Sequence, residues 1–262
     1  WVSRRVAACL AGRFGDQALV SRFGGDEFVV FRTGDVTRTV VEEDASAISA
    51  ALRVPFNLGA NECSVTSSIG IAMADGSRID LDDILTRADL ALYHAKSHGK
   101  ACWSVFHDQM DVDYKKRQQL KAQLRGAIEK GQLFVVYQPI IDIRSRTLVG
   151  CEALVRWRHP EFGVISPALF IPLAEQTGTI TDLTRFVLNT ATRECLNWPE
   201  HMSVSVNLSA NDFRSVSVER MVSETLETSG LPADRLVVEI TETTLIEEPE
   251  KASQVLSSLR SI

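Results

Sequence analysis

One strand-like stretch, residues 147–157, constrains the fold of this chain more than any other feature. Successive side chains of an extended strand point to opposite faces. One face here is wholly apolar: Val149, Cys151, Ala153, Val155 and Trp157. The other face carries Glu152 and Arg156, and charges there are costly unless they are paired, bound to a metal or facing a ligand. The pattern predicts a strand packed under helices, whose other face holds either a functional site or a structural Glu152–Arg156 pair.

From Leu133 onward, strand patterns alternate with helix patterns. The expected strands are 133–138, 147–157, 202–208 and 236–241, and the expected helices are 167–176, 181–197, 213–229 and 249–260. This alternation predicts an α/β fold with a parallel sheet and an outer helical layer. Only about half of the strands of an eight-stranded barrel are present before Ile262, so we expect an incomplete barrel.

Two later strands repeat the asymmetry of the first. Asn207 lies opposite a face of valines and leucine, and Glu239 lies opposite a second apolar face. Oxygen-bearing side chains at the ends of several strands form the C-terminal rim of an α/β barrel. Glu152, Asn207 and Glu239 supply two carboxylates and one amide oxygen, which suit Mg²⁺ or Mn²⁺ better than zinc. We therefore expect these three side chains to converge on one cation.

The first part of the chain contains a hairpin signal. Residues 1–12 have a helical pattern, and two β-prone runs, 18–23 and 28–31, are joined through Gly24-Gly25-Asp26-Glu27. Glycines permit the tight turn and also let a polyanion come close to the backbone. The carboxylates of Asp26 and Glu27 can hold divalent cations beside it, or can form a simple solvated acidic turn.

A strand is expected at 63–73, followed by a helix that Asp80 caps and Gly99 ends. Lys96 and Lys100 lie at the end of this helix, where they complement its dipole or reach a phosphate.

His94 and His98 are four residues apart on the same predicted helix. This spacing can bind a metal, but no third ligand accompanies the pair in the sequence. Surface histidines are therefore the favoured interpretation.

The sequence changes character at residues 104–119, where aspartates precede the basic run 115–117. We place a domain boundary here. The segment enters a helix that ends at Gly131, with a buried stripe of Leu120, Leu124, Ala127 and Ile128. The charge run is most simply a solvated helix face.

Composition limits the classes of function. The net charge of −6 argues against binding of a nucleic-acid polymer. The five cysteines show no CxxC spacing, so free thiols and a cytoplasmic location are expected. No apolar run is long enough to span a membrane. The chain starts at Trp1 without a methionine, so we expect it to be cut there, and a membrane anchor before Trp1 stays open.

Several motifs resemble those of known families. Arg22–Phe28 resembles the signature of GGDEF domains, which are diguanylate cyclases, and Ala88–Lys96 with Gly99-Lys100 resembles a later motif of that family. Five further motifs resemble EAL domains, which are cyclic di-GMP phosphodiesterases: Tyr137–Ile140, Glu152–Trp157, Phe170–Glu175, Val206–Ser209 and Glu239–Glu242. The resemblance covers essentially the whole chain and implies a tandem GGDEF–EAL protein, cut at both ends.

By this resemblance, residues 1–107 are the C-terminal part of a GGDEF α+β domain, whose sheet includes antiparallel strands. Gly24 and Gly25 would admit GTP phosphates, and Asp26 and Glu27 would support two magnesium ions as catalytic carboxylates. Lys96 and Lys100 would bind phosphate. The family joins two GTP molecules across a homodimer, so a homodimer is expected of the parent protein.

By the same resemblance, residues 108–131 are a linker with the first EAL helix, and residues 132–262 are the N-terminal half of a TIM-like EAL barrel. Glu152, Asn207 and Glu239 would be metal ligands, with Glu152 also catalytic. Gln138 and Arg156 would contact the dinucleotide, and Glu242 would steady a loop. Water activated by Mg²⁺ or Mn²⁺ would open one phosphodiester to give pGpG.

The departures from the families also carry expectations. The inhibitory RxxD positions of cyclases hold Gly15 and Ala18, which argues against feedback inhibition there. Further active-site residues of both families would lie before Trp1 and after Ile262. We therefore expect hydrolysis of cyclic di-GMP by the intact parent and no activity of residues 1–262 alone. The alternatives are net synthesis from GTP and a catalytically silent receptor for cyclic di-GMP or GTP.

Overall fold

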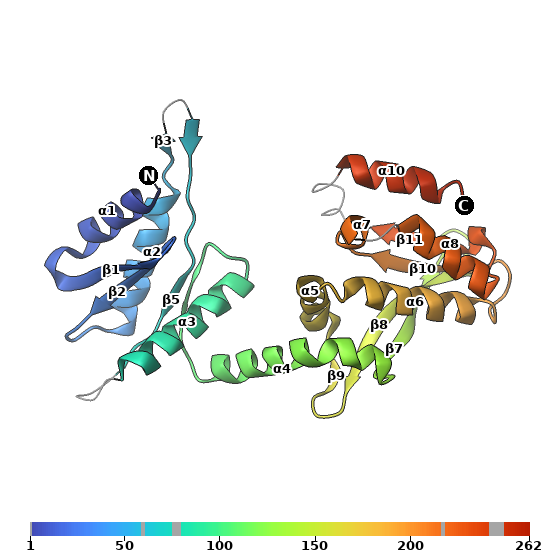
Figure 1. Ribbon diagram of the computed structural model, residues 1–262, viewed down its shortest axis with the longest axis horizontal. Helices are drawn as coiled ribbons and strands as arrows, with labels where there is room; N and C mark the ends of the chain where they lie inside the picture. The colour runs from blue at the N-terminus through green and yellow to red at the C-terminus, as the bar shows by residue number, and fades with distance from the viewer. Residues whose placement is uncertain (1, 59–60, 75–79, 216–217, 241–248) are drawn as a thin grey trace. The chain divides into compact units, whose positions relative to one another are not determined.

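The computed structural model describes residues 2–58, 61–74, 80–215, 218–240 and 249–262 (Figure 1). The chain divides into two compact units, Trp1–Lys116 and Arg117–Ile262. One helix, α4 (Gln109–Glu129), crosses this division. The finer boundaries at residues 107 and 131 stay a prediction.

The described part of unit 1 consists of short strands and three helices that precede α4. Its elements are α1 (Val2–Phe14), a 3₁₀ turn (Gly15–Gln17), β1 (Ala18–Gly24), β2 (Glu27–Arg32), α2 (Arg38–Arg53), β3 (Phe56–Leu58), β4 (Asn61–Cys63), β5 (Ile69–Ile71), α3 (Leu81–Ser97) and β6 (Trp103–Val105). β1 pairs with β2 and β3 with β4 antiparallel, whereas β5 and β6 pair in parallel. The predicted hairpin is confirmed, with Ala18 opposite Arg32 and Gly24 opposite Glu27.

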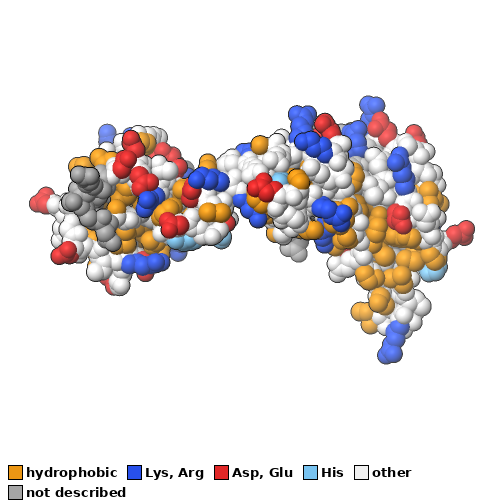
Figure 2. Space-filling model, turned by 90° about the horizontal axis from the view of Figure 1, so that it is seen from below, with side chains coloured by type: hydrophobic (Ala, Val, Ile, Leu, Met, Phe, Trp, Pro, Cys, Tyr) orange, Lys and Arg blue, Asp and Glu red, His pale blue; other side chains and the backbone are white. Residues whose placement is uncertain are grey.

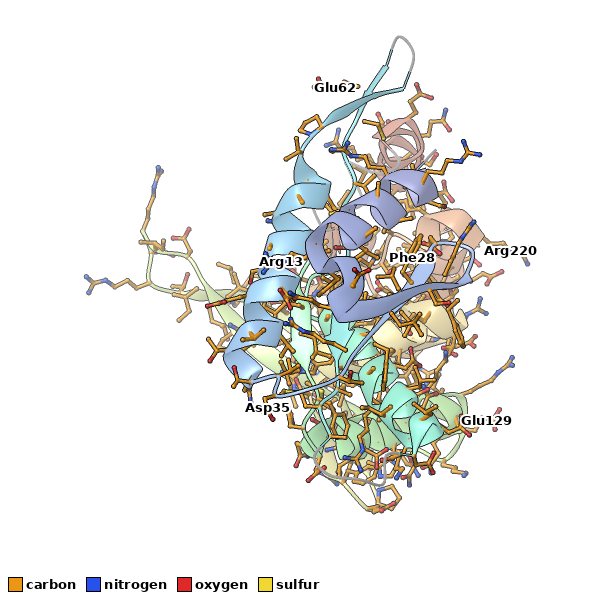
Figure 3. The ribbon with its side chains drawn as sticks, turned by 90° about the vertical axis from the view of Figure 1, so that its left-hand side faces the viewer. Arg13, Phe28, Asp35, Glu62, Glu129 and Arg220 are labelled. Carbon is orange, nitrogen blue, oxygen red and sulfur yellow. The ribbon has the colours of Figure 1, made fainter. Side chains whose placement is uncertain are left out.

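A buried ion cluster ties three elements of unit 1 together. Asp44 on α2 is only 8% exposed, yet it pairs with Arg13 of α1 and Arg32 of β2, each at 2.6 Å. Arg13 lies at the junction of α1 and α2 (Figure 3). Two cations offset the cost of burying this one carboxylate. Helix α2 has no counterpart among the elements expected from the sequence.

The strand predicted at 63–73 is confirmed only in part. β4 ends at Cys63, residues 64–68 have no regular structure, and only Ile69–Ile71 form β5. Serine and threonine fill most of 64–68, and their hydroxyls compete for backbone partners. Ser68 Oγ accepts a hydrogen bond from the amide of Ala101, which is 33 positions away in the link between α3 and β6.

Unit 2 is a sheet covered on one side by helices. Besides α4, its elements are β7 (Leu133–Ile141), β8 (Leu148–His159), β9 (Gly163–Ile165), α5 (Pro167–Thr177), α6 (Ile180–Cys195), β10 (Ser203–Leu208), α7 (Asp212–Ser215), α8 (Val218–Ser229), a 3₁₀ turn (Ala233–Arg235), β11 (Leu236–Ile240) and α10 (Pro249–Leu259). The strand order is β11-β10-β8-β7, with β9 paired to β8.

The sheet departs from the expected all-parallel order. β8, β10 and β11 are parallel, but β7 and β9 run antiparallel to β8. The link from β7 to β8 is too short for a crossover, so it closes a hairpin. The carboxylate of Asp142 stabilises this link by accepting hydrogen bonds from the amides of Arg144 and Ser145. Strand β9 has no counterpart among the strands predicted from the sequence.

The apolar face of β8 packs as predicted. Ala153 and Trp157 of β8 are buried with Val204 and Val206 of β10 in one core. The helices contribute the buried residues on the other side of this core. Helix α6 lies in front of β7 and β8 in Figure 1. The stripe expected on the helix ending before Gly131 also enters this core: Leu120, Leu124 and Ala127 are fully buried, with Ile128 packed against them. Among the described helices, none is both long and apolar enough to cross a bilayer.

Tyr137 on β7 offers a test of this core. Its ring meets Trp198 edge to face, with centroids 5.1 Å apart, and its hydroxyl is buried without a hydrogen-bond partner among the described residues. Burial, followed by the nearby Glu194, raises the pKa of Tyr137 to about 12.

We expect Tyr137→Phe to keep or slightly raise the free energy of unfolding at pH 7, because it removes a buried hydroxyl without a partner. Between about pH 10 and pH 12 the phenol of the unfolded chain ionises before that of the folded chain. The free energy of unfolding of the parent should therefore fall by roughly 1–2 kcal/mol over this range. The variant should lack this loss in urea titrations, whereas Tyr114→Phe, which leaves Tyr137 in place, should retain it. Equal alkaline losses in all three proteins would contradict the assignment.

Candidate functional site

The strand register brings the polar residues of the sheet to one face. In the parallel pairs, Glu152 lies opposite Ser205 and Asn207 lies opposite Glu239. In the antiparallel pair, Gln138 lies opposite Glu152. Directly paired residues project to the same side of a sheet, so all of these side chains share the face that points away from the buried core.

Glu152 and Asn207 are in direct contact. Asn207 Nδ2 donates a hydrogen bond of 2.6 Å to Glu152 Oε1. Asn207 Oδ1 has no hydrogen-bond partner within the described part of the chain, and Asn207 is exposed while Glu152 is half-buried. The amide therefore orients the carboxylate and keeps its own oxygen available to accept.

Glu239 completes the row from β11. It is half-buried beside Asn207, and none of the described hydrogen bonds or ion pairs involves its side chain. Across the described residues, no group of three or more His, Cys, Asp or Glu side chains is placed to hold a metal. The expected set has only two carboxylates and one amide oxygen. Mg²⁺ takes few protein ligands and keeps several waters, so this partial set of oxygen donors fits Mg²⁺ or Mn²⁺.

Arg156 and Gln138 flank this row. Arg156 Nη1 donates to the carbonyl of Val155 at 2.8 Å, and no ion pair joins it to Glu152, both being described residues. The structural Glu152–Arg156 pair is therefore absent here. Gln138 is exposed directly opposite Glu152. Glu242, predicted to steady a loop, lies outside the described residues.

The loop after β10 contains contacts that sequence reasoning missed. Ser209 Oγ donates to Glu175 Oε1 at 2.8 Å, and the Ser209 amide donates to Asp212 Oδ2 at 3.0 Å. Glu175 and Ser209 lie inside motifs that the sequence made visible, but the motifs alone give neither residue a role. The pairing is tertiary, because 34 positions separate the two residues.

The turn between β1 and β2 is open. Gly24, Gly25, Asp26 and Glu27 are all exposed, and a Cβ added at either glycine would meet nothing within 4 Å. Only Gly25 has a positive φ, of 42°. This geometry accommodates an approaching polyanion and equally a solvated acidic turn. Lys96 and Lys100 are exposed, and no hydrogen bond or ion pair among the described residues joins them to the turn.

The histidines of α3 form a cluster larger than the sequence indicated. The His94 and His98 rings stack with centroids 3.9 Å apart, and His107 lies 6.1 Å from His94. Burial, and then the charges of His98 and His107, lower the pKa of His94, with Asp113 opposing the shift. No metal-binding group includes these described histidines.

Comparison with known proteins identifies both units. The family model for the EAL domain matches residues 121–262, and the model for the diguanylate cyclase GGDEF domain matches residues 2–102. The chain belongs to the GGDEF–EAL family. The predicted family and fold class are thereby confirmed: a GGDEF segment is followed by part of an EAL domain.

Two curated relatives and one solved structure are informative. The chain is 33% identical over 250 residues to the bifunctional diguanylate cyclase/cyclic di-GMP phosphodiesterase MucR of Pseudomonas aeruginosa, covering 93% of this chain and 36% of MucR. It is 35% identical over 258 residues to the cyclic di-GMP phosphodiesterase PdeR of Escherichia coli, covering 97% of this chain and 38% of PdeR. The PaMucR phosphodiesterase in complex with c-di-GMP aligns with a TM-score of 0.53 and 35% identity, covering 55% of this chain and 60% of that one. The chain thus spans somewhat over a third of the length of these two relatives.

The contact between Asn207 and Glu152 makes a direct prediction for the EAL site. We expect Asn207→Asp to destabilise the metal-free protein as the pH rises from about 4 to about 7, because two ionised carboxylates then repel each other at hydrogen-bond distance. Over this pH range the free energy of unfolding of Asn207→Asp should fall by about 1 kcal/mol or more relative to that of Asn207→Ala. The alanine variant removes the hydrogen bond without adding charge. Thermal unfolding of both variants in a chelator checks this. Parallel pH profiles for the two variants would show that the side chains at 152 and 207 do not interact.

Proposed function

We propose that the protein containing this chain hydrolyses cyclic di-GMP to pGpG in a reaction that requires Mg²⁺ or Mn²⁺. The observation that carries the proposal is the row of Glu152, Asn207 and Glu239 on one face of an EAL sheet, with Glu152 and Asn207 in contact. The relatives named as phosphodiesterases support this direction. All five cysteines are free, which supports a cytoplasmic site of action.

In this proposal each residue of the row has a separate task. Glu152 and Glu239 supply charge to a divalent cation, and Asn207 supplies a neutral oxygen while its NH₂ group orients Glu152. A bound cation supplies Lewis-acid charge that activates water and offsets the charge of the phosphodiester. Gln138 and Arg156 contact the dinucleotide, the second through guanidinium donors that match phosphate geometry.

The GGDEF segment supports a second proposed activity, the binding or condensation of GTP by a homodimer. The supporting observation is the open β1–β2 turn, where two glycines leave the backbone accessible beside Asp26 and Glu27. Asp26 and Glu27 would support magnesium there, and Lys96 and Lys100 would bind phosphate. On the face shown in Figure 2, basic and acidic side chains both occur in each unit.

The decisive assay uses the full-length gene product with Mg²⁺ or Mn²⁺, supplied with cyclic di-GMP and GTP separately. We expect release of pGpG from cyclic di-GMP. Cyclic di-GMP formed from GTP in excess of hydrolysis would instead establish net synthesis, and binding without turnover would establish a receptor.

Glu152→Ala in the full-length protein should lower hydrolysis by about 100-fold or more, because it removes a charged cation ligand without removing core volume. Glu227→Ala, an exposed glutamate of α8, is the matched control and should keep full activity. Unfolding curves of the two variants should coincide. Normal hydrolysis by Glu152→Ala would refute the cation assignment.

Residues 1–262 expressed alone should neither hydrolyse nor make cyclic di-GMP, because the chain spans only somewhat over a third of the length of the relatives named for these activities. The measurement is nucleotide turnover by chromatography with Mg²⁺ and with Mn²⁺. Substantial turnover by this segment would show that its residues suffice.

A further inference from the structure

Two carboxylates hold the backbone immediately after Asn207. The β10 exit turn, Ser209–Asp212, closes through a hydrogen bond of 3.0 Å from the Asp212 amide to the Ser209 carbonyl. Asp212 Oδ2 accepts from the Ser209 amide at 3.0 Å, and Glu175 Oε1 accepts from the Ser209 hydroxyl at 2.8 Å. Both polar groups that Ser209 can donate from are therefore fixed, two residues beyond Asn207.

Asp212 is a fully buried carboxylate, which is costly for the fold. Its exposed fraction is 0%, and its Oδ1 has no hydrogen-bond partner among the described residues. The hydrogen bonds of this carboxylate are made by its other oxygen, Oδ2, which accepts from the Ser209 amide and also from Thr184 Oγ1 at 2.9 Å. A half-satisfied buried carboxylate destabilises a fold relative to an apolar side chain. Its position points to a geometric task at the exit turn.

Glu175 reaches the same turn from another helix. It lies near the end of α5, and its main-chain carbonyl also accepts from Asn211 Nδ2 at 3.4 Å. Helix α5 follows the β8–β9 segment, whereas Thr184 belongs to α6. The exit turn is therefore held from two helices at once, through Glu175 and through Thr184 and Asp212.

We propose that Glu175 and Asp212 are positioning residues, which lock the β10 exit turn so that the Asn207 amide stays against Glu152 and the row keeps its oxygens aligned for a divalent cation. The proposal rests on the function proposed above. Without the lock, Asn207 would still be present, but its amide would sample other rotamers and bind a cation more weakly.

The chain offers a matched pair of substitutions. Thr184 and Thr192 are both buried on α6, at 5% and 0% exposure. Thr184 donates to Asp212, whereas Thr192 donates to the Leu188 carbonyl of its own helix. Thr→Val keeps the shape at each position and removes one hydroxyl. Glu175 offers a second pair, because Glu175→Gln keeps an acceptor for Ser209 and Glu175→Leu does not.

The experiment measures Mn²⁺ binding by electron paramagnetic resonance in the full-length protein, together with hydrolysis of cyclic di-GMP as a function of Mg²⁺ concentration. Thr184→Val and Glu175→Leu should raise the Mn²⁺ dissociation constant and the half-saturating Mg²⁺ concentration about 3- to 10-fold. At saturating Mg²⁺, kcat should return to within about 3-fold of the parent. Thr192→Val and Glu175→Gln should match the parent in both measurements.

Unchanged Mn²⁺ affinity in Thr184→Val and Glu175→Leu would overturn the proposal. Equal losses of Mn²⁺ affinity in Thr184→Val and Thr192→Val would overturn it too, because they would indicate a general loosening of α6. Absence of Glu152-dependent Mn²⁺ binding in the parent would overturn it as well. A parent that binds Mn²⁺ through Glu152 without hydrolysing cyclic di-GMP would overturn only the proposed function. The Mn²⁺ affinities of the variants would still decide the role of the exit turn.

Discussion

The register of the parallel strands β8, β10 and β11 is the constraint on which the EAL site depends. It places Asn207 level with Glu239 and within hydrogen-bond distance of Glu152. A shift of one residue in β10 would turn Val206 out of the core and Asn207 into it. Val206 is fully buried, so burial of apolar area opposes that shift. The core under the helices thus specifies the register, and the register specifies which oxygen atoms meet on the opposite face.

Two groups of charged side chains in this chain contrast with each other, and the contrast separates scaffold from site. Asp44 is buried between two arginines, and Arg235 is buried with donors to the carbonyls of Cys195, Trp198, Pro199 and Met202. These buried charges have several partners each, as stability requires. Glu152 and Glu239 are half-buried, and the described contacts give them one partner and none, respectively. Charges left short of partners on a sheet face are available to a ligand.

Local patterns predicted most of the strands and their faces, but not the pairings that depend on distant residues. The alternation in 147–157 correctly separated the buried side of β8 from the side bearing Glu152, because that pattern is a property of the strand itself. The antiparallel direction of β7 follows from the short link after Ile141. The alternation of strand and helix patterns does not reveal this direction. The contact of Glu175 with Ser209 could not be predicted, since it depends on how α5 docks against the end of β10.

The glycines show how far the fold alone explains the sequence. At Gly70 and Gly150 an added Cβ would collide with the backbone oxygens of Ala88 in α3 and Ser203 in β10, so the packing itself demands glycine. Gly25 needs a positive φ for its turn. Gly24 has neither requirement, because its φ is not positive and a Cβ there would enter open space. Gly24 does lie at the register shift of the β1–β2 pair, a place where glycine is common, and its open surroundings also admit a bulky anion approaching the backbone from outside. The open surroundings of Gly24 therefore leave room for the proposed GTP site without requiring it.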